Sequence, residues 1–228
     1  MAQSEAPRRR IPVWIELVAL VVIAIVVSVA IKTYVLQMFF VPSESMEPLF
    51  ETQDRILVQK VSYWGNDVSR GDVIVFEDPG GWLGAPPGLN PFQKVLSTVG
   101  LYPEGGHLVK RVIAVGGDRV RCCDRQGRVS VNDVPLDETS YLMPGVEPSA
   151  KDFDVRVPVD RLWVMGDNRP NSEDSRYHQD LRGNGTIPVQ SVVGRVFAIV
   201  WPLGRFTMVQ RPEVFDQEGL KKDPLSRS

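Results

Sequence analysis

The sequence predicts a mostly β domain, built of antiparallel β-sheet, that follows one N-terminal transmembrane helix. Short runs rich in β-branched residues, separated by Gly, Pro, Asn and Asp, fill the chain after the N-terminal region. No helical pattern of about 10 to 15 residues alternates with these runs, which argues against a parallel βαβ architecture. The helix is predicted by one long apolar stretch near the N-terminus. The expected strands are Arg55–Val61, Asp72–Phe76, Val109–Val115, Arg128–Val131, Leu162–Met165 and Val192–Val200.

The composition excludes several classes of protein. A chain of 228 residues, 43% of them apolar, can bury a core without a disulfide framework. A net charge of -2 argues against a nucleic-acid-binding protein, which usually has a basic excess. With 2 histidines and 2 cysteines, the usual Cys/His zinc site is hard to assemble. A Ser-His-Asp hydrolase could use only His107 or His178 as its base.

The apolar stretch from Ile11 to Ile31 contains only one proline, one glutamate and one serine among its other residues. As a helix it would rise roughly 31 Å, which is about the hydrocarbon thickness of a bilayer. We therefore expect a transmembrane anchor at residues 13–33. A removable secretory signal peptide is the alternative, with Ser28-Val29-Ala30 as the cleavage site.

The basic residues around this stretch predict its orientation. Three arginines, residues 8–10, precede it, and Lys32 is the only basic residue between it and Arg55. This asymmetry predicts a cytoplasmic N-terminus at residues 1–12 and a single pass through the cell membrane. The rest of the chain is then extracytoplasmic, and the signal-peptide alternative exports it as well.

The exported part is expected to form one domain over residues 34–210. Gly and Pro are densest in residues 79–106, which we interpret as a loop or insertion between two strands. This segment also holds several large apolar residues, and two alternatives stay open for it. It touches the outer leaflet or the substrate's apolar stretch, or it packs on the domain itself. The polar, charged residues 211–228 are expected to form a flexible tail.

Directly after the predicted anchor, two serines lie between two prolines in the segment Pro42-Ser43-Glu44-Ser45-Met46-Glu47-Pro48. The prolines restrict the backbone and disfavour a regular helix. A backbone fixed in this way can hold a hydroxyl in one direction of attack. A Pro- and Ser-rich linker that leaves a helix is the alternative, and this segment alone favours the linker.

A serine nucleophile needs a base, and neither histidine lies in a recognisable triad setting. Lys110 lies in the apolar run Leu108–Val115, where strand alternation places it on one face with Leu108, Val112 and Ala114. Burial can lower a lysine pKa by up to about 3–5 units, and the neutral amine can then deprotonate a serine. An edge-strand lysine that reaches out to water is the alternative.

A third candidate segment, residues 165–176, follows an expected strand and is dense in turn-forming residues. Its Asn, Asp and Ser side chains can bond to their own backbone and stiffen the loop. Asp167, Asp174 and Arg176 could form a local ion pair that fixes it. An ordinary polar surface loop is the alternative.

In combination and in order, these segments resemble those of bacterial type I signal peptidases, membrane-anchored serine endopeptidases with a Ser-Lys dyad. The resemblance extends from the anchor to about Leu203. Residues 42–48 resemble the segment that carries the nucleophile, which assigns attack to Ser45. Ser43 matches the position whose hydroxyl joins the Ser45 backbone N–H in the oxyanion hole. Residues 70–76 resemble a structural strand of the family.

The later segments carry the remaining assignments. Residues 110–118 resemble the segment of the base and assign that role to Lys110. Residues 166–176 resemble the last segment, in which Ser172 helps to hold the lysine amine. The positions that support the site are Asp167, Asp174 and Arg176. Three positions depart from the family pattern without affecting an assigned catalytic residue: Glu44 in place of a frequent glycine, Pro170 in place of aspartate, and Gly116-Gly117 in place of Pro-Gly.

The resemblance also implies a fold, a substrate and a location. It implies two packed antiparallel sheet regions, with an exposed apolar surface that meets the lipid bilayer. The substrates are secreted preproteins, cut after small residues as in Ala-x-Ala, with no metal and no cofactor. Plausible pocket residues are Val41, Met46 and Val109. Two alternatives remain: a non-catalytic bitopic membrane module, and a Ser-Lys peptidase for another membrane-proximal protein. The oligomeric state stays open.

The adjacent pair Cys122-Cys123 lies outside these segments. Disulfides prefer Cα atoms about 4.4–6.8 Å apart, whereas neighbouring residues are limited to about 3.8 Å. Buried free thiols are therefore the expectation, and the pair is given no catalytic role.

Overall fold

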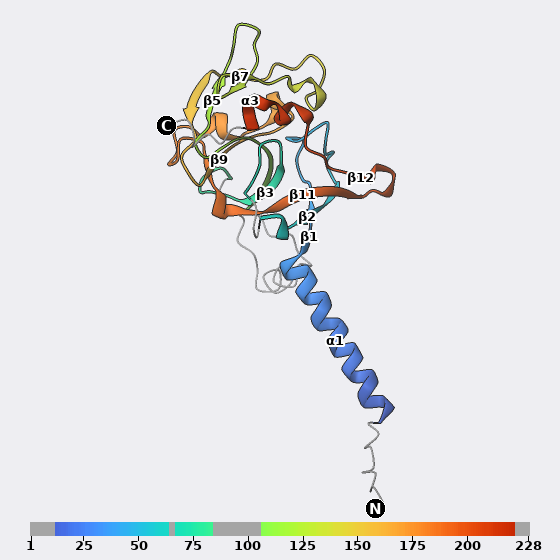
Figure 1. Ribbon diagram of the computed structural model, residues 1–228. Coiled ribbons are helices and arrows are strands. Elements are labelled where there is room, and N and C mark those ends of the chain that lie inside the picture. The colour runs from blue at the N-terminus through green and yellow to red at the C-terminus, as the bar shows by residue number, and fades with distance from the viewer. Residues whose placement is uncertain (1–11, 64–66, 84–105, 222–228) are drawn as a thin grey trace, which may run out of the picture.

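The computed structural model describes residues 12–63, 67–83 and 106–221, apart from the side chains of residues 30–34, 62 and 221. Helix α1 (Val13–Tyr34) extends away from a β domain (Figure 1). Its apolar side chains are exposed, with Leu17 59% and Leu20 64% accessible. Within the part of the chain that the structure describes, no helix is both long enough and apolar enough to cross a membrane. The expected helix is confirmed, and the expected membrane crossing is not.

Within the described ranges, the first sheet has eight strands, and every pairing between them is antiparallel. Its strand order is β1-β2-β11-β3-β4-β9-β10, and β12 pairs with β11. The expectation of a mostly antiparallel β domain is therefore confirmed. The strands are β1 (Leu36–Phe40), β2 (Arg55–Gln59), β3 (Val73–Glu77), β4 (His107–Val115), β9 (Arg161–Met165), β10 (Ile187–Pro188), β11 (Val192–Trp201) and β12 (Thr207–Met208).

The second sheet has four antiparallel strands in the order β7-β6-β5-β8. It lies at the end of the domain opposite to α1 (Figure 1). Its strands are β5 (Arg119–Cys122), β6 (Ser130–Val131), β7 (Val134–Pro135) and β8 (Phe153–Arg156). The short helices are η1 (Val61–Tyr63), η2 (Glu138–Ser140), η3 (Arg169–Asn171), η4 (Ser175–Tyr177), η5 (Val189–Ser191), η6 (Leu203–Arg205), η7 (Glu213–Asp216) and α3 (Glu218–Lys221).

Strand β4 connects separate parts of the core because its side-chain alternation changes along its length. Leu108 and Val112 pack in one apolar cluster, while Ala114 packs with Ile113 in the cluster shared with the second sheet. The pairing of β4 with β9 shifts register between Val112 and Ala114. A bulge of this kind breaks the period of two, so the expectation that Ala114 shares the face of Leu108 is wrong.

The chain after β12 is folded further than expected. Phe215 is 5% and Leu220 is 1% accessible, and both belong to the core cluster beneath the second sheet. The Arg70 guanidinium donates to the Leu220 carbonyl at 2.7 Å. The expected tail at 211–228 is therefore wrong for residues 211–221, because these isolated apolar side chains fill the core. Residues 222–228, most of the expected 79–106 loop and the arginines at 8–10 lie outside the described residues.

Truncating Leu220 tests this packing. Leu220→Ala should lower the free energy of unfolding by about 2–5 kcal/mol, because it leaves a cavity in the core. Glu218, exposed in the same short helix, is the matched control, and Glu218→Ala should stay within about 0.5 kcal/mol. Urea unfolding measures both. Equal stabilities for the two variants would contradict a packed C-terminal segment.

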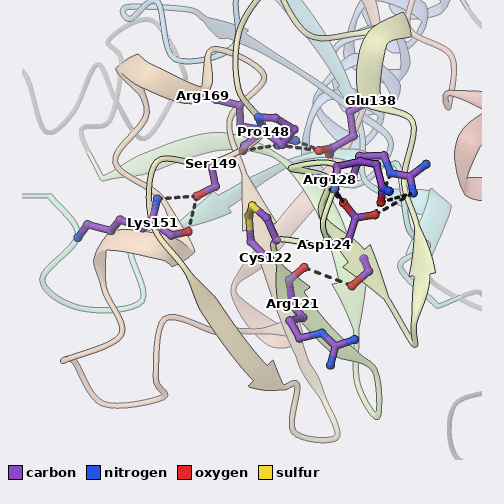
Figure 2. The surroundings of a disulfide bond; sticks show 12 residues. Arg121, Cys122, Asp124, Arg128, Glu138, Pro148, Ser149, Lys151 and Arg169 are labelled. Carbon is purple, nitrogen blue, oxygen red and sulfur yellow. Dashed lines mark hydrogen bonds and ion pairs between the residues drawn. A yellow bond between two sulfur atoms is a disulfide. The ribbon is translucent and has the colours of Figure 1, made fainter.

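The adjacent cysteines are joined. Cys122 and Cys123 form a disulfide with their Cα atoms 3.0 Å apart, so the expectation of free thiols is wrong. Figure 2 shows Cys122 at the end of β5, between the segment of Ser149 and Lys151 and the turn of Asp124 and Arg128. Cys122 ends a strand of the second sheet and packs in the same apolar cluster as Met165, at the start of segment 165–176.

Candidate active site

Ser45 lies in a turn between β1 and β2 that is fixed by buried apolar side chains. Val41, Met46 and Phe50 are at most 3% accessible, whereas Ser43 is exposed and Ser45 is partly exposed. The turn is closed by a backbone hydrogen bond that the Phe50 N–H donates to the Met46 carbonyl oxygen at 3.1 Å. The buried apolar side chains therefore fix the turn in the core, while the Ser45 side chain stays partly exposed at the surface.

Lys110 reaches this hydroxyl from the middle of β4. Its Nζ lies 2.7 Å from Ser45 Oγ, across 65 residues of sequence. The side chain is 4% accessible, so the alternative of a lysine that extends into water does not hold. On β3, Ile74 is its Cα partner and is fully buried. The pairing of β4 with β3 therefore places Lys110 next to a buried apolar residue, and its amine lies within hydrogen-bond distance of the Ser45 hydroxyl.

The environment of Lys110 lowers its pKa to about 8, and burial is the main cause. Asp174 and Asp167 oppose this effect because their charges favour the ammonium, while Arg176 adds to it. At pH 7 the neutral fraction of the amine rises from about 1 in 3000 at the ordinary pKa to about 1 in 10. A base poised in this range can accept a proton from a serine hydroxyl near neutral pH.

The loop after β9 is organised by the fully buried Asp174 carboxylate. It accepts hydrogen bonds from the Gly166 N–H at 2.9 Å, from Ser172 Oγ at 2.8 Å and from Arg176 Nε and Nη2 at 2.8 Å. Burial acts against the charged form, but the hydrogen bonds and charge of Arg176 hold the pKa of Asp174 below its usual range. The expected local ion pair is present as Asp174–Arg176.

Ser172 lies beside the dyad without contacting the amine directly. Among the described residues, the hydrogen bond of Lys110 Nζ goes to Ser45, and the Ser172 hydroxyl donates to Asp174. A side chain on Gly166 would not fit here, because its Cβ would lie 2.2 Å from Ser172 Oγ and 2.4 Å from Ser45 O. The role of Ser172 toward the lysine therefore stays a prediction, with Asp174 as the intermediary.

Asp167 pairs with Arg111, the neighbour of Lys110 on β4. The two side chains form a bidentate ion pair at 2.5 and 2.8 Å, and Arg111 is 2% accessible. Lys110 and Arg111 are neighbours on β4, but Lys110 contacts Ser45 whereas Arg111 pairs with Asp167. A charged residue within an apolar strand, such as Arg111, indicates a buried ion pair, because a charged side chain is almost never fully buried without a partner.

A further buried ion pair, between Arg169 and Glu138, was not expected from the sequence. Arg169 and Glu138 are joined at 2.6 Å, and Tyr141 donates from its hydroxyl to the same carboxylate. Arg169 also donates to the Gly166 carbonyl at 3.0 Å. Glu138 belongs to η2, between β7 and β8 of the second sheet, and no motif around it predicts this contact. The pair ties the second sheet region to the loop that carries Asp174.

The remaining expected site residues surround Ser45. Ser43 Oγ lies 3.4 Å from Ser45 Oγ on the exposed side. Val41 and Met46 are buried in one apolar cluster, and Val109 packs against it. Their expected role as a substrate pocket stays a prediction.

The two histidines have other contacts. The His178 ring stacks on Trp82 at a centroid distance of 4.3 Å, and its Nδ1 lies 2.8 Å from the Asp174 carbonyl oxygen. The His107 ring packs against Phe39 at 5.3 Å. The group that contacts the Ser45 hydroxyl from the buried side is the lysine amine.

The chain is similar to known proteins along most of its length. The chain matches the family described as signal peptidase, peptidase S26, over residues 14–201. It is 40% identical over 222 residues to "Signal peptidase I" of Mycobacterium tuberculosis H37Rv, covering 86% of this chain and 75% of that protein. It is 38% identical over 234 residues to "Probable signal peptidase I" of Mycobacterium leprae, covering 88% and 80%.

A crystal structure of a signal peptidase I from Enterococcus faecalis is also similar, at 24% identity and a TM-score of 0.37. The similarity covers 57% of this chain and 97% of that one. The family match covers well over half of the chain, and both mycobacterial relatives are similar along most of their length. The chain therefore belongs to the signal peptidase family, peptidase S26, and is a serine endopeptidase.

Proposed function

We propose that this chain removes signal peptides from secreted preproteins with a dyad of Ser45 and Lys110. The contact of 2.7 Å between Lys110 Nζ and Ser45 Oγ is the observation that carries the proposal. The lowered pKa of Lys110 supports it, because an ordinary lysine would be protonated and unable to accept the serine proton.

The reaction begins when the neutral Lys110 amine accepts the proton of the Ser45 hydroxyl. Ser45 Oγ attacks the scissile carbonyl carbon, and the oxygen of that carbonyl takes up negative charge. The Ser45 N–H and the Ser43 hydroxyl donate to this oxyanion. The Lys110 ammonium then protonates the leaving amine, and the C–N bond breaks to give an acyl-enzyme.

Hydrolysis of the acyl-enzyme uses the same groups. The Lys110 amine, neutral again, accepts a proton from water while the water oxygen attacks the ester carbon. Collapse of the second tetrahedral intermediate releases Ser45 Oγ, which takes the proton back from Lys110. The carboxylates of Asp174 and Asp167 favour the ammonium that forms in each half of the cycle.

We propose that Val41, Met46 and Val109 line the pocket that selects small residues. They share one apolar cluster, which supports the proposal. Such a pocket would admit alanine and exclude larger side chains by steric clash. Strand β1 lies at one end of the first sheet, where an extended substrate can add by backbone hydrogen bonds.

We further propose that the protein is held at the cell membrane by residues 13–33. The exposed apolar side chains of α1 support this, since water solvates such a surface poorly. A second exposed apolar group lies on β1 and around the β11–β12 hairpin, in the part of the domain near α1 (Figure 1). Its members are Met38, Phe40, Trp201, Leu203, Phe206 and Met208, each at least 49% accessible. This surface is suited to contact with lipid.

Cleavage of a labelled preprotein by the full chain in detergent or liposomes tests the proposal. Wild type should release the mature protein, and Ser45→Ala should lose at least about 10³-fold in rate without a change in melting temperature. Saturable partner binding by both forms, with no cleavage by either, would instead support a non-catalytic module. Preproteins with large residues at positions one and three before the bond test specificity, and equal rates on them would favour a different substrate class.

A further inference from the structure

From the backbone geometry we infer that Asn168 is a positioning residue that aims the oxyanion-hole N–H of Ser45. The inference rests on the proposed function and adds a residue that the dyad does not require. It starts from a contact between the turn of Ser45 and the loop after β9. The Asn168 side chain donates from Nδ2 to the Glu44 carbonyl at 3.0 Å, across 124 residues of sequence.

The Glu44 carbonyl and the Ser45 N–H belong to one peptide unit. That unit is trans, and in a planar trans peptide the C=O and N–H bonds point in opposite directions. A hydrogen bond that fixes the carbonyl therefore also fixes the direction of the N–H. The Asn168 amide holds the carbonyl on the loop side, so the Ser45 N–H is directed away from that loop.

A second contact fixes the following peptide unit. The Asn168 backbone N–H donates to the Ser45 carbonyl at 3.1 Å. Asn168 thus contacts the carbonyls on both sides of the nucleophile, one from its side chain and one from its backbone. With both neighbouring peptide units held, the Ser45 N–H cannot rotate out of the oxyanion position without breaking a hydrogen bond.

The local structure around Asn168 shows that its side chain is used for this contact. Asn168 stands at the N-cap position of η3, where asparagine usually bonds to the backbone of its own helix. It makes no such cap bond, and its side chain is 7% accessible. The amide that could cap its own helix is therefore directed to the turn of the nucleophile.

Its neighbour Asn171 provides a matched comparison. Asn171 is exposed, and its Nδ2 donates to the Glu44 side-chain carboxylate at 3.0 Å instead of the backbone. Both asparagines therefore contact the same residue, but only Asn168 contacts the peptide unit that carries the Ser45 N–H. A difference between their variants isolates the effect on that peptide unit from any general contact with Glu44.

The test compares Asn168→Ala and Asn171→Ala in the full chain, with a signal-peptide substrate. Complete loss of an oxyanion donor costs about 10²–10³ in kcat, so misdirection of the N–H in Asn168→Ala should lower kcat by about 10- to 100-fold. KM should stay within about threefold, because ground-state binding is untouched. Asn171→Ala should retain both constants. The pH at half-maximal kcat/KM should be unchanged in Asn168→Ala, because Lys110 keeps its surroundings.

Three results would overturn the inference: kcat of Asn168→Ala within twofold of wild type, a loss confined to KM, or an equal loss in Asn171→Ala. If Asn168→Ala does not fold, Asn168→Asp takes its place in the same comparison. Aspartate keeps the side-chain shape of asparagine but cannot donate to the Glu44 carbonyl. Absence of cleavage by wild type would instead reject the proposed function.

Discussion

Replacing Lys110 with methionine should abolish peptidase activity and at the same time stabilise the protein. Methionine keeps much of the side-chain volume but cannot accept a proton, so kcat/KM should fall by at least about 10³-fold. Lys151 is exposed, with its amine over the Tyr177 ring, and Lys151→Met is the matched control that should keep its activity. Preprotein cleavage measures both variants.

The gain in stability follows from the depressed pKa. The pKa of Lys110 is about 8 in the folded chain against 10.5 as the reference value, so the unfolded chain binds this proton more tightly. At 1.36 kcal/mol per pH unit, this difference costs the folded state about 3 kcal/mol below pH 8. The cost disappears as the pH rises from about 8 to 10.5. Lys110→Met removes it, and urea unfolding at pH 7 should show the gain. A variant that is inactive and also less stable would instead indicate a structural lysine.

Replacing Asp174 with asparagine should destabilise the fold by about 3–5 kcal/mol, because the buried Arg176 loses its charge partner. The pair Arg119–Asp154 is the matched control, since it is also bidentate but about half exposed. Asp154→Asn should therefore cost less than about 1 kcal/mol. Urea unfolding at pH 7 gives both values, and similar losses in the two variants would contradict a special role for the buried carboxylate.

The pH dependence of stability provides a second measure of Asp174. Its pKa is lowered in the folded chain, so its contribution is present above the reference value of 3.8 and is lost as the pH falls through the folded-state pKa. The stabilities of wild type and Asp174→Asn should therefore converge in strong acid. A constant difference down to the lowest pH at which the protein folds would show that the carboxylate charge is not responsible.

Much of the first sheet could be predicted because its strands are apolar and bounded by turn-forming residues. The expected Leu162–Met165 and Val192–Val200 correspond to β9 and β11 within one residue at each end. Strand β1 was missed because Leu36–Phe40 continues the apolar character of the preceding helix and offers no boundary. Strand β8 was missed because its sequence, Phe-Asp-Val-Arg, alternates apolar and charged residues and lacks the apolar run that marks the predicted strands.

The site could be predicted in its chemistry but not in its supporting contacts. The aliphatic neighbours of Lys110 along β4 indicated a buried lysine as one of two alternatives, and the structure shows that it is buried. The partner of Arg169 is Glu138, 31 residues away on another sheet region, and only the tertiary fold brings them together. The packed residues Phe215 and Leu220 are equally hidden, because single apolar residues in a polar segment give no periodic signal.

The central claim is that a buried, neutral Lys110 is the base for Ser45, and the pH dependence of kcat/KM for wild type tests it most directly. The rate of cleavage should rise with pH and reach half its maximum near pH 8, the pKa that burial gives Lys110. Half-maximal activity near pH 6.5 would indicate a histidine base, and a value near 10.4 would indicate a solvated lysine. Either result would contradict the account.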